Sequence, residues 1–295
     1  MNLRTAQREA VKAARAVGAI MRGQLASAKR VLKTTQHDIK LELDVRCQKL
    51  IERRLHSAFP DIGLIGEEGV AGNPSAEYRW VVDPLDGTVN FAYGIPHACV
   101  SIALQSRVSE RPEHTPKAFG AAPRGSSASI AQRWSSALRP HSAPYPDGYQ
   151  TLLGIVYDPF CDELWTAIEG GPARLNGKVI RVSRRRRLAE AIVCIGLSKT
   201  REHLEATLPF LNDLARRARK IRIMGAGALD LTYVASGRFD AYIERNIRLW
   251  DIAAGGLILE CAGGEFSRQP IAGEHAYRML ASNGLLRHEL RAHRQ

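Results

Sequence analysis

The chain has 295 residues, of which 45% are hydrophobic, enough to bury a substantial core in one large domain or two smaller ones. No run of about 18 apolar residues occurs, so the sequence predicts no transmembrane helix. The formal charge of +12 suggests anionic partners, but the densest basic run, Arg184 to Arg187, has no interleaved aromatic residue and is predicted to be a solvated loop rather than a nucleic-acid patch.

The spacing of the cysteines and the composition of residues 1–30 indicate the cellular compartment. The five cysteines lie singly without a C-x-x-C pair, which argues against a structural zinc site and against a secreted disulfide scaffold. Basic residues interrupt any apolar stretch among residues 1–30, so no secretory signal is predicted. We expect a cytoplasmic protein with mostly buried thiols.

The first half combines amphipathic helices with short strands. Apolar residues from Val11 to Leu25 recur every three or four positions and predict a helix, and a second helix over 47–59 ends before Pro60. Asn176-Gly177 predicts a hairpin turn. Short apolar runs predict strands at 62–65, 80–82, 98–104 and 152–156.

The stretch from Ser106 to Gln150 differs from the rest. It holds six of the fourteen prolines and eight serines, with almost no hydrophobic periodicity. Such a segment within a compact domain predicts a flexible surface insertion.

The second half continues the mixture of helices and strands. Its predicted strands are 192–195, 222–224 and 241–244, and its predicted helices are 204–218, 229–235 and 251–261. Gly263-Gly264 would stop the last helix. This mixture predicts an α/β architecture built in layers.

A turn with two aspartates follows the predicted strand at 80–82. In W-V-V-D-P-L-D-G-T, Pro84 turns the chain so that Asp86 can fold back near Asp83. Two carboxylates this close are costly unless a cation separates them, and oxygen ligands without histidine or cysteine favour magnesium over zinc. In isolation, D-x-x-D-G would more often be an ordinary surface turn, so the flanking motifs decide.

Two further acidic motifs flank this turn. Glu67 follows the neighbouring predicted strand in G-E-E, and Asp251 lies at a predicted helix start, where by itself it would be a plain N-cap. In chain order, G-E-E, W-V-V-D-P-L-D-G-T and W-D-I-A-A-G-G resemble the signature of the inositol monophosphatase family, and the resemblance runs to A-S-N-G at 281–284 apart from 106–150. It implies an α/β (α+β) sugar-phosphatase fold with αβαβα layers, and one catalytic unit whose halves are 1–190 and 191–295.

The resemblance also implies a site for two or three Mg²⁺ ions. Glu67, Asp83 and the Leu85 carbonyl would hold the first ion. Asp83, Asp86 and Asp251 would hold the second, and a third would lie near Glu67.

Further roles are implied around these ions. The backbone amides of Gly87 and Thr88 would bind the phosphate at a helix start. Thr88 and Asp44 would orient and deprotonate the attacking water, with Lys33 close to the metals. Glu68 is expected to face away from the ligands, since successive strand residues point to opposite sides.

The substrate would meet a second set of residues. A carboxylate matching Glu244 would contact a substrate hydroxyl, although Glu244 could also be a strand-end surface charge. The loop at 225–227 departs from the common family pattern, in which a hydroxyl residue follows the first glycine and alanine comes next. The implied pocket comprises Asp86, Gly87, Thr88, Gly225, Ala226, Gly227, Glu244 and Asp251.

These features predict a magnesium-dependent phosphatase that hydrolyses inositol monophosphate or a similar small polyol or sugar phosphate. The resemblance implies that it is lithium-sensitive and forms a homodimer. The alternatives within the enzyme class are phosphatases for histidinol phosphate, fructose bisphosphate or phosphoadenosine phosphate. A non-enzymatic alternative is an RNA- or transcription-associated regulator, which the basic charge allows.

Overall fold

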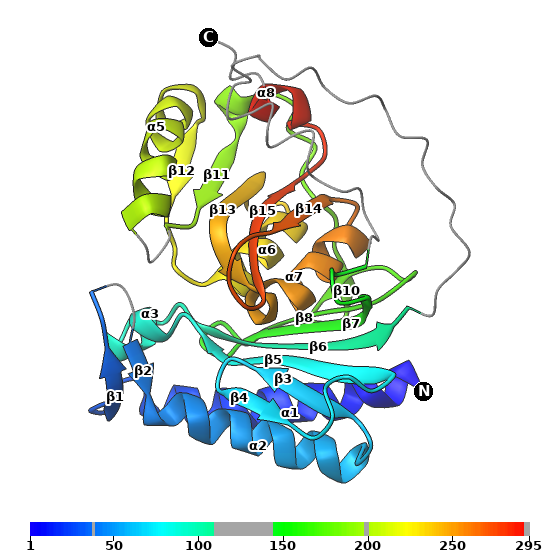
Figure 1. The fold of residues 1–295 in the computed structure, drawn as a ribbon. Helices are drawn as coiled ribbons and strands as arrows, with labels where there is room; N and C mark the ends of the chain where they lie inside the picture. Colours follow the sequence, from blue (N-terminus) through cyan, green and yellow to red (C-terminus); the bar gives the residue numbers. More distant parts are fainter. Residues whose placement is uncertain (37–38, 109–143, 198–200, 292–295) are drawn as a thin grey trace.

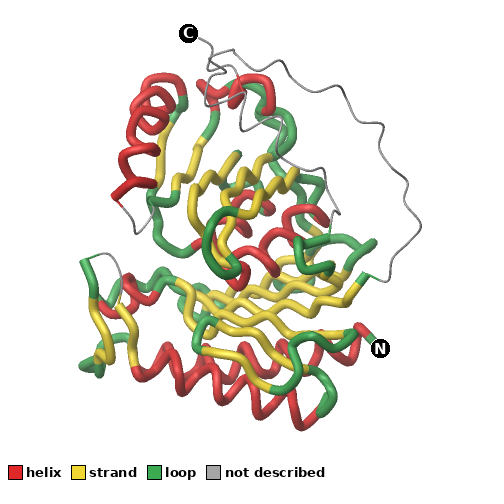
Figure 2. Tube along the Cα trace, in the orientation of Figure 1, coloured by secondary structure: helices red, strands yellow, loops and turns green. Residues whose placement is uncertain are grey.

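The computed structural model describes residues 1–36, 39–108, 144–197 and 201–291, and it stacks them in five layers (Figures 1 and 2). A helical layer lies beneath an eight-stranded sheet, and two central helices separate this sheet from a five-stranded one. An outer helical layer covers the far face of the five-stranded sheet. The predicted αβαβα arrangement is confirmed. Within these residues, no helix combines the length and apolar character needed to span a bilayer.

The first helical layer consists of α1 (Leu3–Gln24) and α2 (Glu42–Ala58). The Asn2 side chain caps α1 by accepting hydrogen bonds from the amides of Arg4 and Thr5, both at 3.1 Å. Both helices bury an apolar face against the larger sheet, as the periodicity predicts. A short hairpin that the sequence analysis missed, β1 (Val31–Thr34) and β2 (Ile39–Leu41), connects them.

The larger sheet has the strand order β10-β9-β8-β7-β6-β5-β3-β4. Its strands are β3 (Gly63–Gly66), β4 (Gly69–Ala71), β5 (Tyr78–Asp86), β6 (Cys99–Arg107), β7 (Tyr149–Asp158), β8 (Glu163–Ile168), β9 (Arg174–Leu175) and β10 (Lys178–Val179). Strand β5 pairs in parallel with β3 and antiparallel with β6, and layers on both faces bury it. The predicted hairpin is confirmed, with Asn176 and Gly177 at φ of 47° and 80° between β9 and β10.

Strands β6 and β7 are longer than predicted and extend into both ends of the predicted insertion. Pairing continues to Arg107 opposite Tyr149. Polar residues inside the strands obscured this extension in the sequence, but they are buried and hydrogen-bonded: Arg79 donates to Gln105 at 2.9 Å, and Gln105 donates to Thr151 at 3.1 Å. The rest of the predicted insertion, 109–143, lies outside the described residues.

The smaller sheet has the order β12-β11-β13-β15-β14. Its strands are β11 (Ile192–Ile195), β12 (Lys220–Arg222), β13 (Ala241–Arg248), β14 (Glu265–Pro270) and β15 (Ala276–Ser282). The prediction placed β12 two residues too late and missed β14 and β15. The remaining helices are α3 (Thr88–Ala92), η1 (Leu188–Glu190), α5 (Arg201–Arg217), α6 (Gly227–Ala235), α7 (Leu249–Cys261) and α8 (Arg287–Arg291).

Candidate active site

Strand β5 does not turn at Pro84 as predicted but runs on to Asp86, with a register shift against β6 between Asp83 and Asp86, and local hydrogen bonds hold this irregular end. The Asp83 carboxylate accepts from the Leu85 amide at 2.9 Å, and the Thr88 hydroxyl donates to the Leu85 carbonyl at 2.9 Å. Gly87 has a φ of 91°, and a Cβ there would lie 2.8 Å from the His97 carbonyl oxygen. The turn therefore needs glycine both for its conformation and for space.

Asp86 reaches from this turn to the start of α6. Its carboxylate accepts hydrogen bonds from the amides of Gly227 at 3.1 Å and Ala228 at 2.7 Å. The positive end of the helix dipole favours a carboxylate there. These contacts join residues 141 and 142 positions apart in the chain, and no local motif predicts them.

Asp251 approaches from the first turn of α7. It is the third residue of the helix and not its N-cap, because α7 begins at Leu249. Its carboxylate accepts from the Arg248 amide at 2.9 Å, which holds the side chain at the helix start. The plain N-cap interpretation is therefore wrong in position, because Asp251 instead accepts from the backbone amide of the N-cap residue, as in a capping box.

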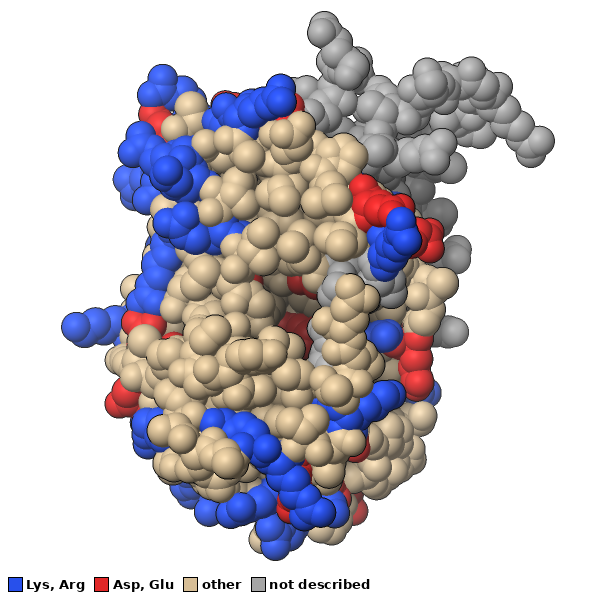
Figure 3. Space-filling model, turned by 90° about the vertical axis from the view of Figure 1, so that its left-hand side faces the viewer, with Lys and Arg blue, Asp and Glu red and all other residues tan. Residues whose placement is uncertain are grey.

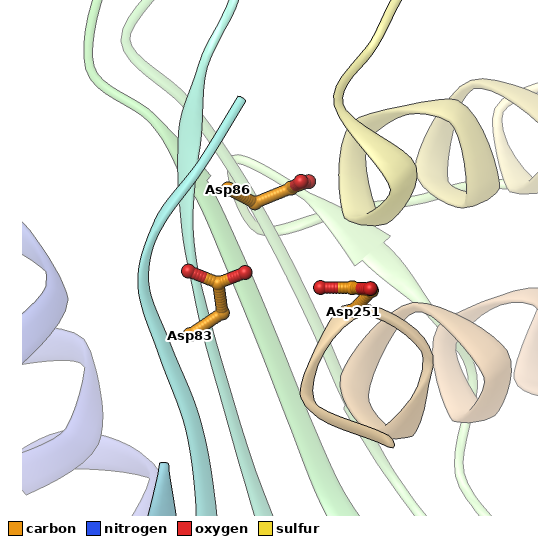
Figure 4. A group of neighbouring side chains, drawn as sticks. All are labelled: Asp83, Asp86 and Asp251. Carbon is orange, nitrogen blue, oxygen red and sulfur yellow. The ribbon is translucent and has the colours of Figure 1, made fainter. Parts of the chain in front are cut away.

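Asp83, Asp86 and Asp251, hereafter the acidic cluster, converge between β5, α6 and α7. Each offers a carboxylate oxygen, and these oxygens lie within 4.8 Å of one another. Asp83 and Asp251 point toward each other, and Asp86 points toward the start of α6 (Figure 4). Acidic side chains are visible inside a central hollow of the surface, with Lys and Arg on the surrounding face (Figure 3).

The electrostatics of the cluster fit a cation. Burial, followed by the charges of neighbouring acids with Glu67 first, raises the pKa of Asp83 well above its usual value. Burial and then Asp251 raise the pKa of Asp86 to about 7, against the opposing effect of the α6 amides. Ionised together, these groups repel one another, and a bound cation would remove that repulsion. The donors are all oxygen atoms, which suits Mg²⁺ or another hard cation.

A cavity of about 600 Å³ opens over the cluster. It brings together most of the residues that the sequence analysis selected: Glu67, Asp83, Leu85, Asp86, Gly87, Thr88, Gly225, Ala226, Gly227, Glu244 and Asp251. It also brings in residues that the sequence analysis missed, including Asn90, Gly196, Tyr242, Asn246 and Trp250.

Two of the predicted catalytic residues line a different hollow. Lys33 and Asp44 lie in a smaller hollow of about 190 Å³, which shares only Glu67 with the larger cavity. The Asp44 carboxylate accepts from the Leu41 amide at 2.8 Å at the start of α2, whereas the Thr88 hydroxyl donates to Leu85. Their predicted pairing around a water stays a prediction.

Glu68 lies outside the larger cavity. Its carboxylate forms an ion pair with Lys40 at 2.5 Å, and its side chain is only 4% exposed. Both residues line the smaller hollow with Glu67. Because Glu67 also lines the larger cavity and Glu68 does not, the two glutamates of the G-E-E motif have different surroundings.

Asn90, in α3, connects the predicted substrate loop to the wall of the cavity. Its side-chain amide donates to the carbonyls of Met224 at 2.8 Å and His97 at 3.0 Å. Gly225, next in the loop, has a φ of 78°, which favours glycine. Since the contact with Met224 spans 134 residues of sequence, only the folded chain reveals it.

Comparison with known proteins agrees with this geometry. The sequence model of the inositol monophosphatase family matches residues 2–112 and 147–293. The chain belongs to the inositol monophosphatase family. The break in the match, 113–146, falls inside the predicted insertion. Family membership and the named relatives indicate a phosphatase of a metal-dependent family, and the acidic cluster is a group of carboxylates that could hold a metal ion.

Individual relatives of this family cover nearly the whole chain. Nus factor SuhB of Xylella fastidiosa is 33% identical over 292 residues, 95% of this chain and 90% of that protein. Inositol monophosphatase 2 of Solanum lycopersicum is 35% identical over 263 residues, 86% and 84% of the two chains. The crystal structure of extragenic suppressor protein suhB from Bartonella henselae superposes with a TM-score of 0.77 at 29% identity, covering 97% of each chain.

Proposed function

We propose that the protein is a magnesium-dependent phosphatase that hydrolyses inositol monophosphate or a similar small polyol phosphate. The observation that carries the proposal is the acidic cluster, in which two buried carboxylates and one half-buried carboxylate converge beside a cavity large enough for a small ester. Buried acids in such an arrangement are costly for a protein that has no cation to hold.

The ligands follow from the side chains present. Glu67, Asp83 and the Leu85 carbonyl are proposed to hold one Mg²⁺ ion, and Asp83, Asp86 and Asp251 a second. When bound, magnesium neutralises charge on the phosphoryl group and makes a coordinated water more acidic. This chemistry needs no nucleophile from the protein.

The chain's own groups would position the reactants. The amides of Gly87 and Thr88 begin α3 at the cavity wall, where they can donate to phosphate oxygens. The Thr88 hydroxyl donates a hydrogen bond to the Leu85 carbonyl, so its oxygen can accept a hydrogen bond from the attacking water. Asp44, in the adjoining hollow, is proposed to receive the proton of that water.

A substrate hydroxyl is proposed to be recognised by Glu244, a partly buried carboxylate at the cavity wall. A hydrogen bond to a charged acceptor is stronger than a neutral one, so a substrate without the hydroxyl loses a strong contact in the closed pocket. The variant Glu244→Gln should therefore reduce discrimination between inositol monophosphate and a simple aryl phosphate by about 1–3 kcal/mol. An equal fall for both esters would instead give Glu244 a role in the scaffold.

The activity itself is tested with a panel of phosphate monoesters. We expect hydrolysis with Mg²⁺, none with excess chelator, recovery on adding Mg²⁺ back, and inhibition by lithium. Histidinol phosphate, fructose bisphosphate and phosphoadenosine phosphate belong in the panel, because preference for one of them would change the substrate and leave the metal chemistry standing. Full activity in chelator would contradict the proposal. Light scattering of the same sample tests the proposed homodimer.

A second candidate function is association with transcription. It is favoured by the similarity to a protein named Nus factor SuhB and by the chain's formal charge of +12. Binding to RNA that weakens steeply with salt and survives Asp251→Asn would support this role beside the phosphatase. Loss of binding together with loss of the metal site would argue against a separate role.

A further inference from the structure

Tyr242 lies beside Glu244 on the same side of β13. The two residues are two positions apart, and alternate residues of a strand share a face. Tyr242 is only 1% exposed, and its phenol hydroxyl donates a hydrogen bond to Oε2 of Glu244. A residue from the core thus contacts the carboxylate that faces the cavity.

The end of β11 provides the space for this carboxylate. Gly196 donates its amide to the Ile243 carbonyl at 2.9 Å, which brings it beside β13. A Cβ on Gly196 would overlap Oε2 of Glu244. The carboxylate therefore occupies a place that a larger residue at position 196 would fill.

The phenol is suited to act as a permanent donor. Burial, followed by the charge of Glu244, raises the pKa of Tyr242 well above its usual value. The hydroxyl therefore keeps its proton at neutral pH and donates a hydrogen bond to the carboxylate. Tyr242 also packs within the central apolar cluster, so its ring is held in place independently of this hydrogen bond.

We propose that Tyr242 is a positioning residue for substrate specificity, which holds the Glu244 carboxylate where it accepts a hydrogen bond from a hydroxyl of a polyol phosphate. The inference rests on the proposed function. Tyr242 does not need to touch substrate, since it acts through Glu244. Gly196 is part of the same device, because its missing side chain leaves room for the carboxylate.

The variant Tyr242→Phe tests the role, since it deletes one hydroxyl and keeps the buried ring. We expect kcat/KM for inositol monophosphate to fall about tenfold, as for loss of one hydrogen bond to a charged group, mainly through a higher KM. Hydrolysis of an aryl phosphate without such a hydroxyl should stay within about twofold of the parent. The matched control is Tyr157→Phe, which also removes a buried phenol that donates to a carboxylate, that of Asp162 at 2.8 Å, on the other side of the larger sheet.

Two further variants separate positioning from general stability. In the Glu244→Gln background, Tyr242→Phe should have no further effect on the ratio of the two esters, because its target is already changed. Gly196→Ala should lower the same ratio by displacing the carboxylate, with Mg²⁺-dependent hydrolysis of the aryl phosphate retained. Thermal unfolding of each variant confirms that it is folded.

These outcomes distinguish a failure of the substrate assignment from a failure of the role of Tyr242. If the parent shows no preference for inositol monophosphate, both the substrate assignment and the role of Tyr242 fail. If the parent has the preference and Tyr242→Phe leaves it unchanged, or lowers both esters equally, only the role of Tyr242 is overturned. An effect of Tyr242→Phe that persists in full without Glu244 also overturns it.

Discussion

Asp240 and the acidic cluster have opposite surroundings. Asp240, fully buried, accepts hydrogen bonds from the Arg185 guanidinium at 2.8 Å, the Ser183 hydroxyl and the Ile192 amide at 2.8 Å. In the acidic cluster Asp83 and Asp86 are also buried and Asp251 is half-buried, but the three carboxylates lie close to one another. Burial alone therefore does not show what an acid does, and the charge and donors around it do.

The difference separates folding from chemistry. Donors around Asp240 compensate the cost of removing its charge from water, so it connects the loop before β11 to the start of β13. In the acidic cluster the cost is only partly compensated and is left as mutual repulsion that a cation can relieve. A site that binds a cation needs this residual repulsion, whereas a structural contact is weakened by it.

The largest effect is expected from removing one charge of the acidic cluster. Asp251→Asn keeps the shape and can still accept from the Arg248 amide, but it weakens the proposed second metal site. Losing about 3–4 kcal/mol of transition-state stabilisation slows turnover by roughly 10²–10³. The measurement is kcat with saturating Mg²⁺, and the fold should survive. An active variant would remove Asp251 from the site, and an unfolded one would make it structural.

Asp86 gives a pH signature in the metal-free protein. Its folded-state pKa of about 7 lies above the ordinary value of 3.8, so the folded state holds the proton more tightly. The contribution of Asp86 to the free energy of unfolding is therefore fully present below about pH 4. It is lost as the pH rises to 7, by an amount on the order of 3 kcal/mol. Denaturant unfolding in chelator should show Asp86→Asn gaining stability relative to the parent across this window. A constant difference would contradict the repulsion.

A smaller effect on stability is expected at Asp240. Asp240→Asn keeps one acceptor but places an amide group against donors, which should cost about 1–3 kcal/mol of unfolding free energy. Because Asp240 takes no part in the acidic cluster, kcat of the folded protein should change little. The test is to measure denaturant unfolding and kcat on one sample. A large loss of kcat without loss of stability would contradict the structural role given to Asp240.

The sequence predicted those parts of the site that lie in short motifs. The strand at 80–82 and its turn placed Asp83 next to Asp86, and the family resemblance added Glu67 and Asp251. The structure brings all of these residues to one cavity. Local patterns were sufficient here because a buried strand, a proline and a glycine constrain the chain within a few residues.

Contacts between distant segments could not be predicted in this way. The bond from Asp86 to α6 depends on how the central helices pack on the larger sheet, and the placement of Gly196 against Glu244 depends on the pairing of β11 with β13. Strands β14 and β15 were missed, and the ends of β6 and β7 were hidden by polar residues that find partners only after folding. Periodicity shows which residues are apolar, but it does not show which polar residues will pair.

The central claim, that the acidic cluster is built for a cation, is tested most directly by thermal unfolding with and without Mg²⁺. The parent should be stabilised by about 2.7 kcal/mol at a Mg²⁺ concentration 100 times the Kd, with a matching rise in Tm. Asp240→Asn should start from a lower Tm and rise by the same amount. Asp251→Asn should start at or above the parent's metal-free Tm and rise little. A parent whose Tm ignores Mg²⁺, or an Asp251→Asn variant that rises as much as the parent, would contradict the account.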